Sequence, residues 1–235
     1  KQNFPFEIMP VHYAFPTPIY YVKPKDEDEY DLIQEELINV HENTEYQQPE
    51  FFPKSASHEL TPNPFGSNVI KKYNCSNFLE FLKREVKDFL GSLDYTNPME
   101  YLIDASWITK TTKGKFALEH THGATDISGV YYIKTNEQDG NLFFKDPNER
   151  SVGNLLMDLT VQQNVAPLQQ GLLILWPGYL SHGTFANETD HERLSLSFNI
   201  KFTRRGFTIK DNVENTRALV VRDDNWRDYV DHEDL

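Results

Sequence analysis

The stretch HERLSLSFNI, residues 191–200, decides the fold of this chain. Polar and apolar side chains alternate strictly from Arg193 to Ile200. A period of two is typical of a β-strand, because successive side chains of a strand point to opposite faces of the sheet. The apolar face of this strand is expected to pack against another layer, while the polar face meets water or lines a cavity.

Short segments of similar character precede this strand from about residue 101 onward. Clusters of Gly, Pro, Asn and Asp separate them and favour turns, and no helix-length pattern interrupts the series. The strand candidates are 101–111, 115–120, 127–134, 140–146, 155–164, 171–177, 182–187 and 193–203. Many short strands at this spacing indicate a sandwich, a jelly roll or a barrel.

The first hundred residues have a different pattern. Residues 15–23 form a short strand candidate between prolines, and residues 44–67 are rich in loop-forming residues. Residues 26–43 carry apolar side chains at helical spacing with acids in the first turn, where they favour the helix dipole. Residues 77–93 repeat the helical spacing, and Gly91 suits a C-terminal cap. The predicted fold class is therefore α+β, mainly β.

We expect one structural domain made of three parts. Residues 1–100 form an N-terminal support of strand and helices, and residues 101–207 form the β core on which the helices pack. Residues 208–235 form an acidic C-terminal tail on the surface.

Charge and composition limit the class of partner. The chain has 235 residues and a formal net charge of -13, which disfavours nucleic acid because backbone binding needs clustered Lys and Arg. The longest apolar run, residues 171–180, is too short to span a bilayer. A single cysteine, Cys75, excludes an intramolecular disulfide framework. We expect a small-molecule or peptide substrate, no membrane partner, and a cytoplasmic location, in the host if the protein is viral.

Three histidines form a candidate metal site. His120 and His122 lie two residues apart, so both side chains point to one face if the segment is extended. His182 follows an apolar strand and a Pro-Gly turn, at the rim of the predicted β core. Imidazole is a ligand for Zn, Cu, Fe and Ni. The alternative is an exposed pair of histidines, with His182 bonded to a turn carbonyl.

The polar face of the strand at 193–203 is a candidate anion site. Arg193 offers a planar fork of donors, and Ser195 adds a hydroxyl two residues along. This combination suits a carboxylate, although the same pattern occurs on strand faces that are simply exposed to solvent.

Four motifs follow one another within residues 101–203: HTHGATDISGVYYI, GNLFFKDP, GLLILWPGYLSHGT and ERLSLSFNI. This order of His-x-His, Ser-Gly-x-Tyr-Tyr, His and Arg-x-Ser resembles the Fe(II)- and 2-oxoglutarate-dependent oxygenase superfamily, especially its bacterial and phage branch. The resemblance implies a double-stranded β-helix, the jelly roll of cupin-like proteins, as the catalytic core. It also implies Fe(II), the cosubstrate 2-oxoglutarate and O2.

The resemblance assigns roles to the candidate residues. His120 would be the proximal iron ligand and His182 the distal one, while Arg193 and Ser195 would hold the C5 carboxylate of 2-oxoglutarate. His122 stands where most of the superfamily has Asp or Glu. Either the site is a three-histidine face, or His122 begins a site without a protein carboxylate, with Asp126 as an alternative ligand. We predict His120, His122 and His182 together, with no catalytic residue beyond these ligands.

Two neighbouring tyrosines are candidates for the cosubstrate pocket. Tyr131 and Tyr132 lie on opposite faces of one strand, so one of them can donate its hydroxyl to 2-oxoglutarate while the other packs away from it. The sequence does not decide between them. Trp107 and Trp176 are expected to be core or rim residues without a catalytic role.

The predicted function is oxidation, most often hydroxylation, of a protein side chain or an amino-acid-like substrate, with release of succinate and CO2. The alternative is a non-catalytic jelly-roll module that binds a metal or a carboxylate. A zinc hydrolase is disfavoured, because its candidate general base, Glu119, points to the strand face opposite the histidines.

Overall fold

The computed structural model of the chain describes residues 16–48, 50, 59–62, 67–147, 163–203 and 218–223. The helices are α1 (Glu27–Glu42), α2 (Val69–Lys72) and α3 (Ser76–Gly91). The strands are β1 (Tyr20–Val22), β2 (Glu59–Leu60), β3 (Glu100–Thr111), β4 (Ile127–Lys134), β5 (Leu142–Lys145), β6 (Gln163–Val165), β7 (Leu173–Pro177), β8 (His182–Thr184), β9 (Arg193–Phe202) and β10 (Leu219–Arg222).

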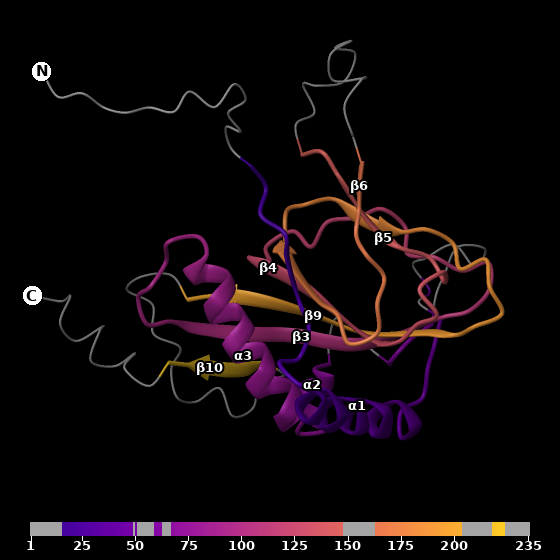
Figure 1. Cartoon of the computed structure of the whole chain (residues 1–235), viewed down its shortest axis with the longest axis horizontal. Helices are drawn as coiled ribbons and strands as arrows, with labels where there is room; N and C mark the ends of the chain where they lie inside the picture. Colours follow the sequence, from indigo (N-terminus) through magenta and orange to yellow (C-terminus); the bar gives the residue numbers. More distant parts are fainter. Residues whose placement is uncertain are drawn as a thin grey trace, which may run out of the picture.

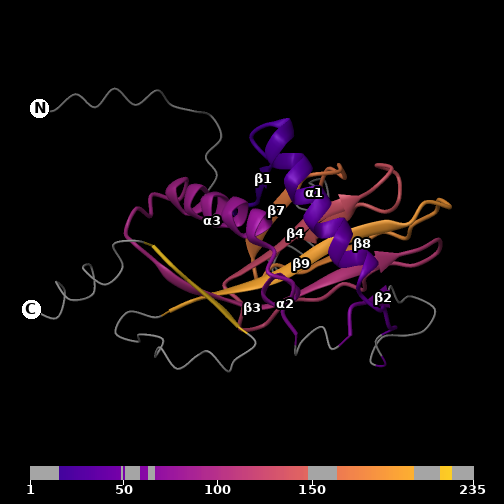
Figure 2. The ribbon, with the colours of Figure 1, turned by 90° about the horizontal axis from the view of Figure 1, so that it is seen from below.

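The strands form two antiparallel sheets. The larger sheet has the order β1-β7-β4-β9-β3-β10, with β2 paired to β3, and the smaller has the order β6-β5-β8. The helices α1 and α3 lie across one face of the larger sheet, and β5 and β6 lie on the other side (Figures 1 and 2). The molecule is therefore layered, with helices, a large sheet and a small sheet in succession. The prediction of an α+β, mainly β fold is confirmed, although the two sheets do not close into a barrel.

The helical layer packs through a continuous apolar core. Apolar side chains of α1 and α3 meet the apolar face of the large sheet, as where Phe78 contacts Phe198 edge to face at 5.9 Å between ring centroids. The start of α1 is capped by Asp26, whose Oδ1 accepts the Glu29 N–H at 2.9 Å. The predicted amphipathic helices are confirmed, and their apolar stripes are what attach them to the sheet.

A second apolar core lies between the two sheets. It joins residues of β4, β5 and β7, including Val130, Phe144 and Trp176. Consecutive residues of β4 and β9 therefore face different layers, one toward the helices and the next toward the small sheet. This alternation places the polar face of β9 between the sheets.

The structure differs from the expected elements at several places. Residues 115–120 form no regular strand and are joined to β8 through an isolated bridge at His120. Of the candidate 155–164, only the end lies in the described part, as β6. The short helix α2 and the strands β2 and β10 were not expected. β10 lies within the predicted surface tail, yet it pairs with β3 and buries Val221.

No helix in the described part of the chain is long and apolar enough to cross a membrane.

Candidate metal centre

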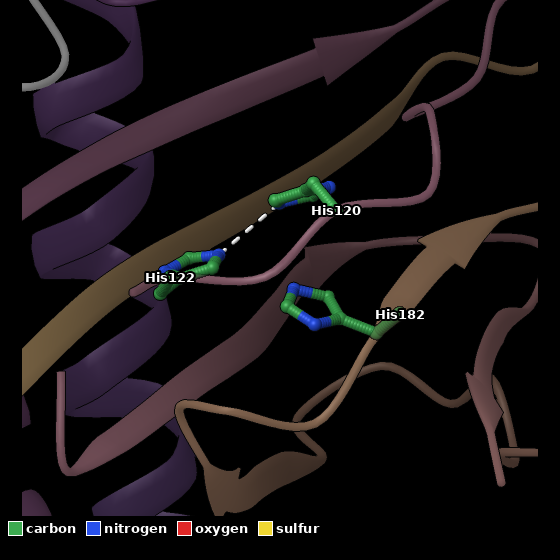
Figure 3. A group of neighbouring side chains, drawn as sticks. All are labelled: His120, His122 and His182. Carbon is green, nitrogen blue, oxygen red and sulfur yellow. Dashed lines mark hydrogen bonds between the residues drawn. The ribbon is translucent and has the colours of Figure 1, made fainter. Parts of the chain in front are cut away.

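The three predicted histidines converge on one point. His120, His122 and His182 each offer one ring nitrogen, and these atoms lie within 4.8 Å of one another. The rings face a common space although they come from segments far apart in the chain (Figure 3). The Nε2 atoms of His120 and His122 are 3.1 Å apart. Among the described residues, these histidines form the one group of three or more potential ligands of this kind.

Backbone pairing holds the two segments together. His120 and His182 pair as an antiparallel bridge, with N–H to carbonyl distances of 2.9 and 3.0 Å in the two directions. The His122 N–H donates to the Gly178 carbonyl at 3.1 Å. A Cβ on Gly178 would lie 2.2 Å from the Thr125 carbonyl oxygen, so this close approach of two backbones requires glycine.

Each imidazole has an oxygen acceptor for its Nδ1–H. His120 Nδ1 lies 2.6 Å from the Leu118 carbonyl, and His182 Nδ1 lies 2.8 Å from the Leu180 carbonyl. His122 Nδ1 lies 2.5 Å from the Asn199 side-chain oxygen. A neutral imidazole carries one proton, so a proton on Nδ1 leaves a lone pair on Nε2.

This arrangement gives the 3.1 Å contact between His120 and His122 a specific meaning. The dashed line between them in Figure 3 joins two Nε2 atoms that both carry lone pairs when both Nδ1 atoms are protonated. Two lone pairs at this distance repel each other, whereas a cation held between them attracts both. The donor set therefore fits a metal ion, with Nε2 as the ligand atom of each histidine.

Burial keeps two of these imidazoles neutral. It lowers the pKa of His122 to about 4, against a smaller opposing effect of the Asn199 hydrogen bond. It lowers the pKa of His182 to about 3, and the neighbouring His120 and His122 act in the same direction. Both rings are therefore neutral at pH 7, which is the state that binds a metal.

Two tryptophans enclose the histidines. The Trp107 ring is stacked on His122, with 6.1 Å between centroids and 24° between planes. Trp176 meets His182 edge to face at 4.8 Å. Both tryptophans are buried in apolar clusters, as the sequence indicated, and both also line the pocket.

The Arg193 guanidinium is buried close by and is held by four acceptors. Its Nη1 donates to the carbonyls of Asp139, at 3.0 Å, and of Gly140. Its Nη2 donates to the hydroxyls of Thr111 and Thr184, both at 3.3 Å. Burial lowers the pKa of Arg193, while Tyr132 and Asp139 oppose that shift. The guanidinium is thus fixed in place before any ligand binds.

The Nε–H of Arg193 is buried and has no hydrogen-bond partner among the described residues. An unpaired buried donor on a cationic group is costly unless an acceptor reaches it. This orphaned donor fits an anionic ligand such as a carboxylate.

The histidines and Arg193 line one pocket between the sheets, with a volume of about 500 Å³. The polar face of β9 forms one wall, so the alternation read from the sequence does line a cavity. The other walls are mostly apolar. Side chains of the pocket outside the histidines include Leu60, Trp107, Thr109, Val130, Tyr132, Leu142, Trp176, Thr184, Arg193, Ser195, Ser197 and Asn199.

The structure separates the two candidate tyrosines. Tyr132 lines the pocket, and burial raises its pKa to about 12, so its hydroxyl remains a donor at neutral pH. Tyr131 lies on the opposite face of β4, packed edge to face on Phe78, and its hydroxyl accepts from Gln34 Nε2 at 3.1 Å. Tyr131 therefore does not reach the pocket, and that part of the cofactor-site prediction needs correction.

Asp126, the alternative ligand, lies outside the histidine group. Its side chain is exposed, and its Oδ2 accepts the Phe202 N–H at 2.8 Å. The reason is that the chain bends at Gly123, which has a φ of 58°, so the even spacing from His122 does not keep Asp126 on the same face.

The sequence did not predict the side chains that position His122 and Arg193 through hydrogen bonds. Asn199 was visible as part of a polar strand face, but its contact with His122 depends on tertiary structure. Asp139 carried no signal, although its buried carboxylate accepts from Thr135 and His191 and shapes the turn whose carbonyls hold Arg193.

Comparisons with known proteins agree with this geometry. Residues 105–199 match the model of a family described as "Putative 2OG-Fe(II) oxygenase". No curated protein shows significant sequence similarity to this chain.

Solved structures share the fold at low identity. The alpha ketoglutarate dependent epimerase SnoN from nogalamycin biosynthesis is 13% identical over 79% of this chain and 78% of its own, with a TM-score of 0.57. An oxidoreductase of the 2OG-Fe(II) oxygenase family from Burkholderia pseudomallei is 14% identical over 78% and 85%, with a TM-score of 0.56. A Pseudomonas putida prolyl-4-hydroxylase is 14% identical over 80% and 94%, with a TM-score of 0.51. These matches support the double-stranded β-helix as the fold.

Proposed function

Because residues 105–199 match a family described as "Putative 2OG-Fe(II) oxygenase", we propose that the chain is an Fe(II)- and 2-oxoglutarate-dependent oxygenase whose iron ligands are His120, His122 and His182. The observation that carries this proposal is the convergence of three Nε2 lone pairs, each fixed by a hydrogen bond at Nδ1. When bound, iron and 2-oxoglutarate supply the oxidising chemistry, in which O2 oxidises a substrate while 2-oxoglutarate becomes succinate and CO2. A face of three protein ligands leaves positions open for exogenous ligands.

Arg193 and Ser195 hold the C5 carboxylate of 2-oxoglutarate in this proposal. The orphaned Nε–H of Arg193 is a buried cationic donor, and Ser195 lines the same pocket two residues along β9. Tyr132 pairs with Ser195 across β4 and β9 and lines the pocket as well, so its hydroxyl is a third donor. Charge-assisted hydrogen bonds of this kind are stronger than neutral ones.

The ligand at position 122 changes the charge of the site. Replacing a carboxylate by a neutral imidazole removes one negative charge from the metal's coordination shell. We expect Fe(II) to bind more weakly than it would with a carboxylate in that place, a change that does not by itself prevent turnover.

The substrate in this proposal is an uncharged side chain of a protein or a similar amino-acid-like group, which undergoes hydroxylation. Its support is the chemistry of the pocket. Apart from Arg193 and the three histidines, the described lining residues are uncharged, and Leu60, Trp107 and Val130 are apolar. An uncharged side chain can enter such a pocket without the energetic cost of removing a charged group from water.

An anaerobic titration tests the site. Adding Fe(II) and then 2-oxoglutarate is expected to produce a metal-to-ligand charge-transfer band, and air should then release CO2 from 2-oxoglutarate. His182→Gln should abolish the band, whereas His41→Gln, which alters a histidine of α1 bonded to Tyr46, should keep it. Unchanged metal binding in His182→Gln would disprove the ligand assignment. Binding without any decarboxylation would favour the non-catalytic module.

The same assay tests the cosubstrate site. Arg193→Lys removes the orphaned Nε–H and cannot occupy all four acceptors that the guanidinium reaches. We expect the affinity for 2-oxoglutarate to fall at least about tenfold, since a charge-assisted bond contributes roughly 1.5–3 kcal/mol, while metal binding alone persists. If the native protein and Arg193→Lys bound 2-oxoglutarate with equal affinity, Arg193 would be excluded from this role.

Matched substrates test the class of substrate. Each uncharged amino acid is offered either free, as a zwitterion, or capped as its N-acetyl, N-methylamide derivative, and the stimulation of 2-oxoglutarate decarboxylation is measured. We expect stimulation from capped forms, because they carry no charge into the pocket. Stimulation by the zwitterions alone would contradict the proposal.

A further inference from the structure

We infer that Asn199 is a positioning residue of the metal centre, which fixes His122 in the tautomer whose Nε2 is free to bind the metal. This inference rests on the proposed function for the identity of the site. It concerns a contact in the chain itself, between the Asn199 side-chain oxygen and His122 Nδ1, at 2.5 Å.

His122 differs from the other two ligands in how it is held. The Nδ1 atoms of His120 and His182 are each bonded to the backbone carbonyl two residues earlier, so a local feature of the chain sets their tautomer. His122 instead depends on a side chain 77 residues away in the sequence. Position 199 is therefore the point at which a single substitution changes the protonation pattern of one ligand.

The surroundings of Asn199 favour an oxygen facing His122. Ser128, directly across from Asn199 in the pairing of β4 with β9, places its hydroxyl 3.4 Å from the same oxygen. The Asn199 oxygen thus lies between two possible donors, the Ser128 hydroxyl and the His122 Nδ1–H. Trp107 is stacked on the His122 ring and limits its rotation.

The opposite orientation of the amide would have a distinct outcome. If the Asn199 NH2 group faced His122, Nδ1 would be an acceptor and Nε2 would carry the proton. That proton would then lie on the 3.1 Å line between the Nε2 atoms of His122 and His120, as a hydrogen bond between the two rings. The orientation of Asn199 thus decides whether His122 offers the metal a lone pair or gives a proton to its neighbour.

The position of Asn199 also connects the two halves of the site. Arg193, Ser195 and Asn199 lie on the same face of β9 and all line the pocket. In the proposed enzyme, one strand would therefore position both the cosubstrate and the metal ligand that replaces the usual carboxylate.

The test combines two substitutions with a matched control. Asn199→Ala removes the acceptor, and Asn199→Asp replaces the amide by a carboxylate, which has no N–H and therefore accepts the Nδ1–H. Ser197→Ala is the control, because it removes a polar side chain from the same strand face and the same pocket. The tautomer of His122 is read by 15N NMR in the metal-free protein, and the affinity for Ni(II) is measured by calorimetry.

We expect the native protein to show the Nδ1–H form of His122 and Asn199→Ala to show the Nε2–H form. Ni(II) affinity should fall about 10–100-fold in Asn199→Ala, the usual effect of losing a partner that orients a metal ligand. Asn199→Asp should keep the Nδ1–H form and restore the affinity, and Ser197→Ala should leave both measurements unchanged. If Asn199→Ala does not fold, Asn199→Ser removes the same carbonyl with a smaller loss of volume.

Two results would overturn the inference: an Nε2–H tautomer of His122 in the native protein, or unchanged tautomer and Ni(II) affinity without the Asn199 carbonyl. The failure of the proposed function looks different. In that case His182→Gln would leave Ni(II) binding intact, whereas the tautomer of the metal-free protein would still report on Asn199.

Discussion

Gly129, in the middle of β4, leaves room for side chains of the two strands that pair with β4, namely β7 and β9. A Cβ at this position would lie 2.3 Å from Cζ of Phe198 and 2.9 Å from Cδ2 of Leu175. Phe198 is fully buried and also contacts Phe78 of α3. The absent side chain of Gly129 is thus the space into which the aromatic ring of β9 packs.

Gly129→Ala is therefore expected to destabilise the protein. Overpacking of a buried site costs about 1–3 kcal/mol, and the cost should appear as a lower free energy of unfolding in urea. Gly91→Ala is the matched control, because a Cβ there meets nothing within 4 Å at the end of α3. It should be neutral or slightly stabilising. Equal effects of the two substitutions would contradict this account of Gly129.

The predictable part of the site consists of residues whose type and spacing carry the chemistry. His120 and His122 share a face through their spacing of two, and Arg193 with Ser195 shares one for the same reason. The choice between Tyr131 and Tyr132 depends on which face of β4 meets the helices, which no local pattern contains. The role of Asn199 could not be predicted either, because it depends on a contact with His122, which lies on another segment of the chain.

At the scale of elements, an ion pair ties α1 to α3. Both carboxylate oxygens of Glu29 accept from Arg84, at 2.6 and 2.9 Å. The hydrogen bond from Arg84 is the main cause that lowers the pKa of Glu29 below its ordinary 4.5. Because the Arg84 side chain is 37% exposed, solvent screens the pair, and its contribution to stability is about 0.5–1 kcal/mol.

Glu29→Gln should therefore lower the free energy of unfolding at pH 7 by about that amount. A carboxyl whose pKa is lower in the folded state stabilises the protein above its unfolded pKa, and this stabilisation is lost as the pH falls through the folded value. The difference between native protein and variant should thus shrink below pH 4.5. Urea unfolding at pH 7 and pH 3 measures it.

The control for that pair is Glu80→Gln. Glu80 bonds to Lys83 on α3, but its side chain is 72% exposed, so little change is expected at either pH. A loss in Glu80→Gln as large as that in Glu29→Gln would show a general charge effect instead of a specific tie between helices.

Elements with a strong periodic pattern were predictable, and those defined by pairing were not. The helices α1 and α3 and the strands β3, β4, β7 and β9 follow the sequence pattern closely. β10 has only four residues in an otherwise acidic segment, and its partner β3 lies more than a hundred residues earlier. Residues 115–120 have a strand-like composition, but their backbone hydrogen bonds to Asn187, Thr184 and His182 are spaced too irregularly to form a regular strand.

At the scale of the whole molecule, ligand binding should raise the free energy of unfolding. The pocket lies between the two sheets, so a ligand bound there contacts both and stabilises only the folded chain. A ligand present at a free concentration of 100 times its Kd raises the free energy of unfolding by about 2.7 kcal/mol. For a chain of this size, that corresponds to a rise in Tm of about 5–10 °C.

Thermal unfolding with Ni(II) and 2-oxoglutarate together should show this rise, and His182→Gln should abolish it. Mg2+ in place of Ni(II) is the control, since it prefers oxygen ligands over imidazole. An equal rise with Mg2+ would contradict binding at the histidines.

Because β9 has one apolar and one polar face, it limits which mutations the protein can accept during evolution. Leu196 and Phe198 belong to the helical core, while Ser195, Ser197 and Asn199 alternate with them in sequence and line the pocket. A slip of one residue would exchange the two sets, placing polar groups among the helices and aromatic groups beside the histidines. We therefore expect an insertion or deletion in this strand to disturb both faces at once, whereas a single substitution changes only one face. A selection for activity in a library of variants would at the same time select for correct packing of the helices, because both depend on one register.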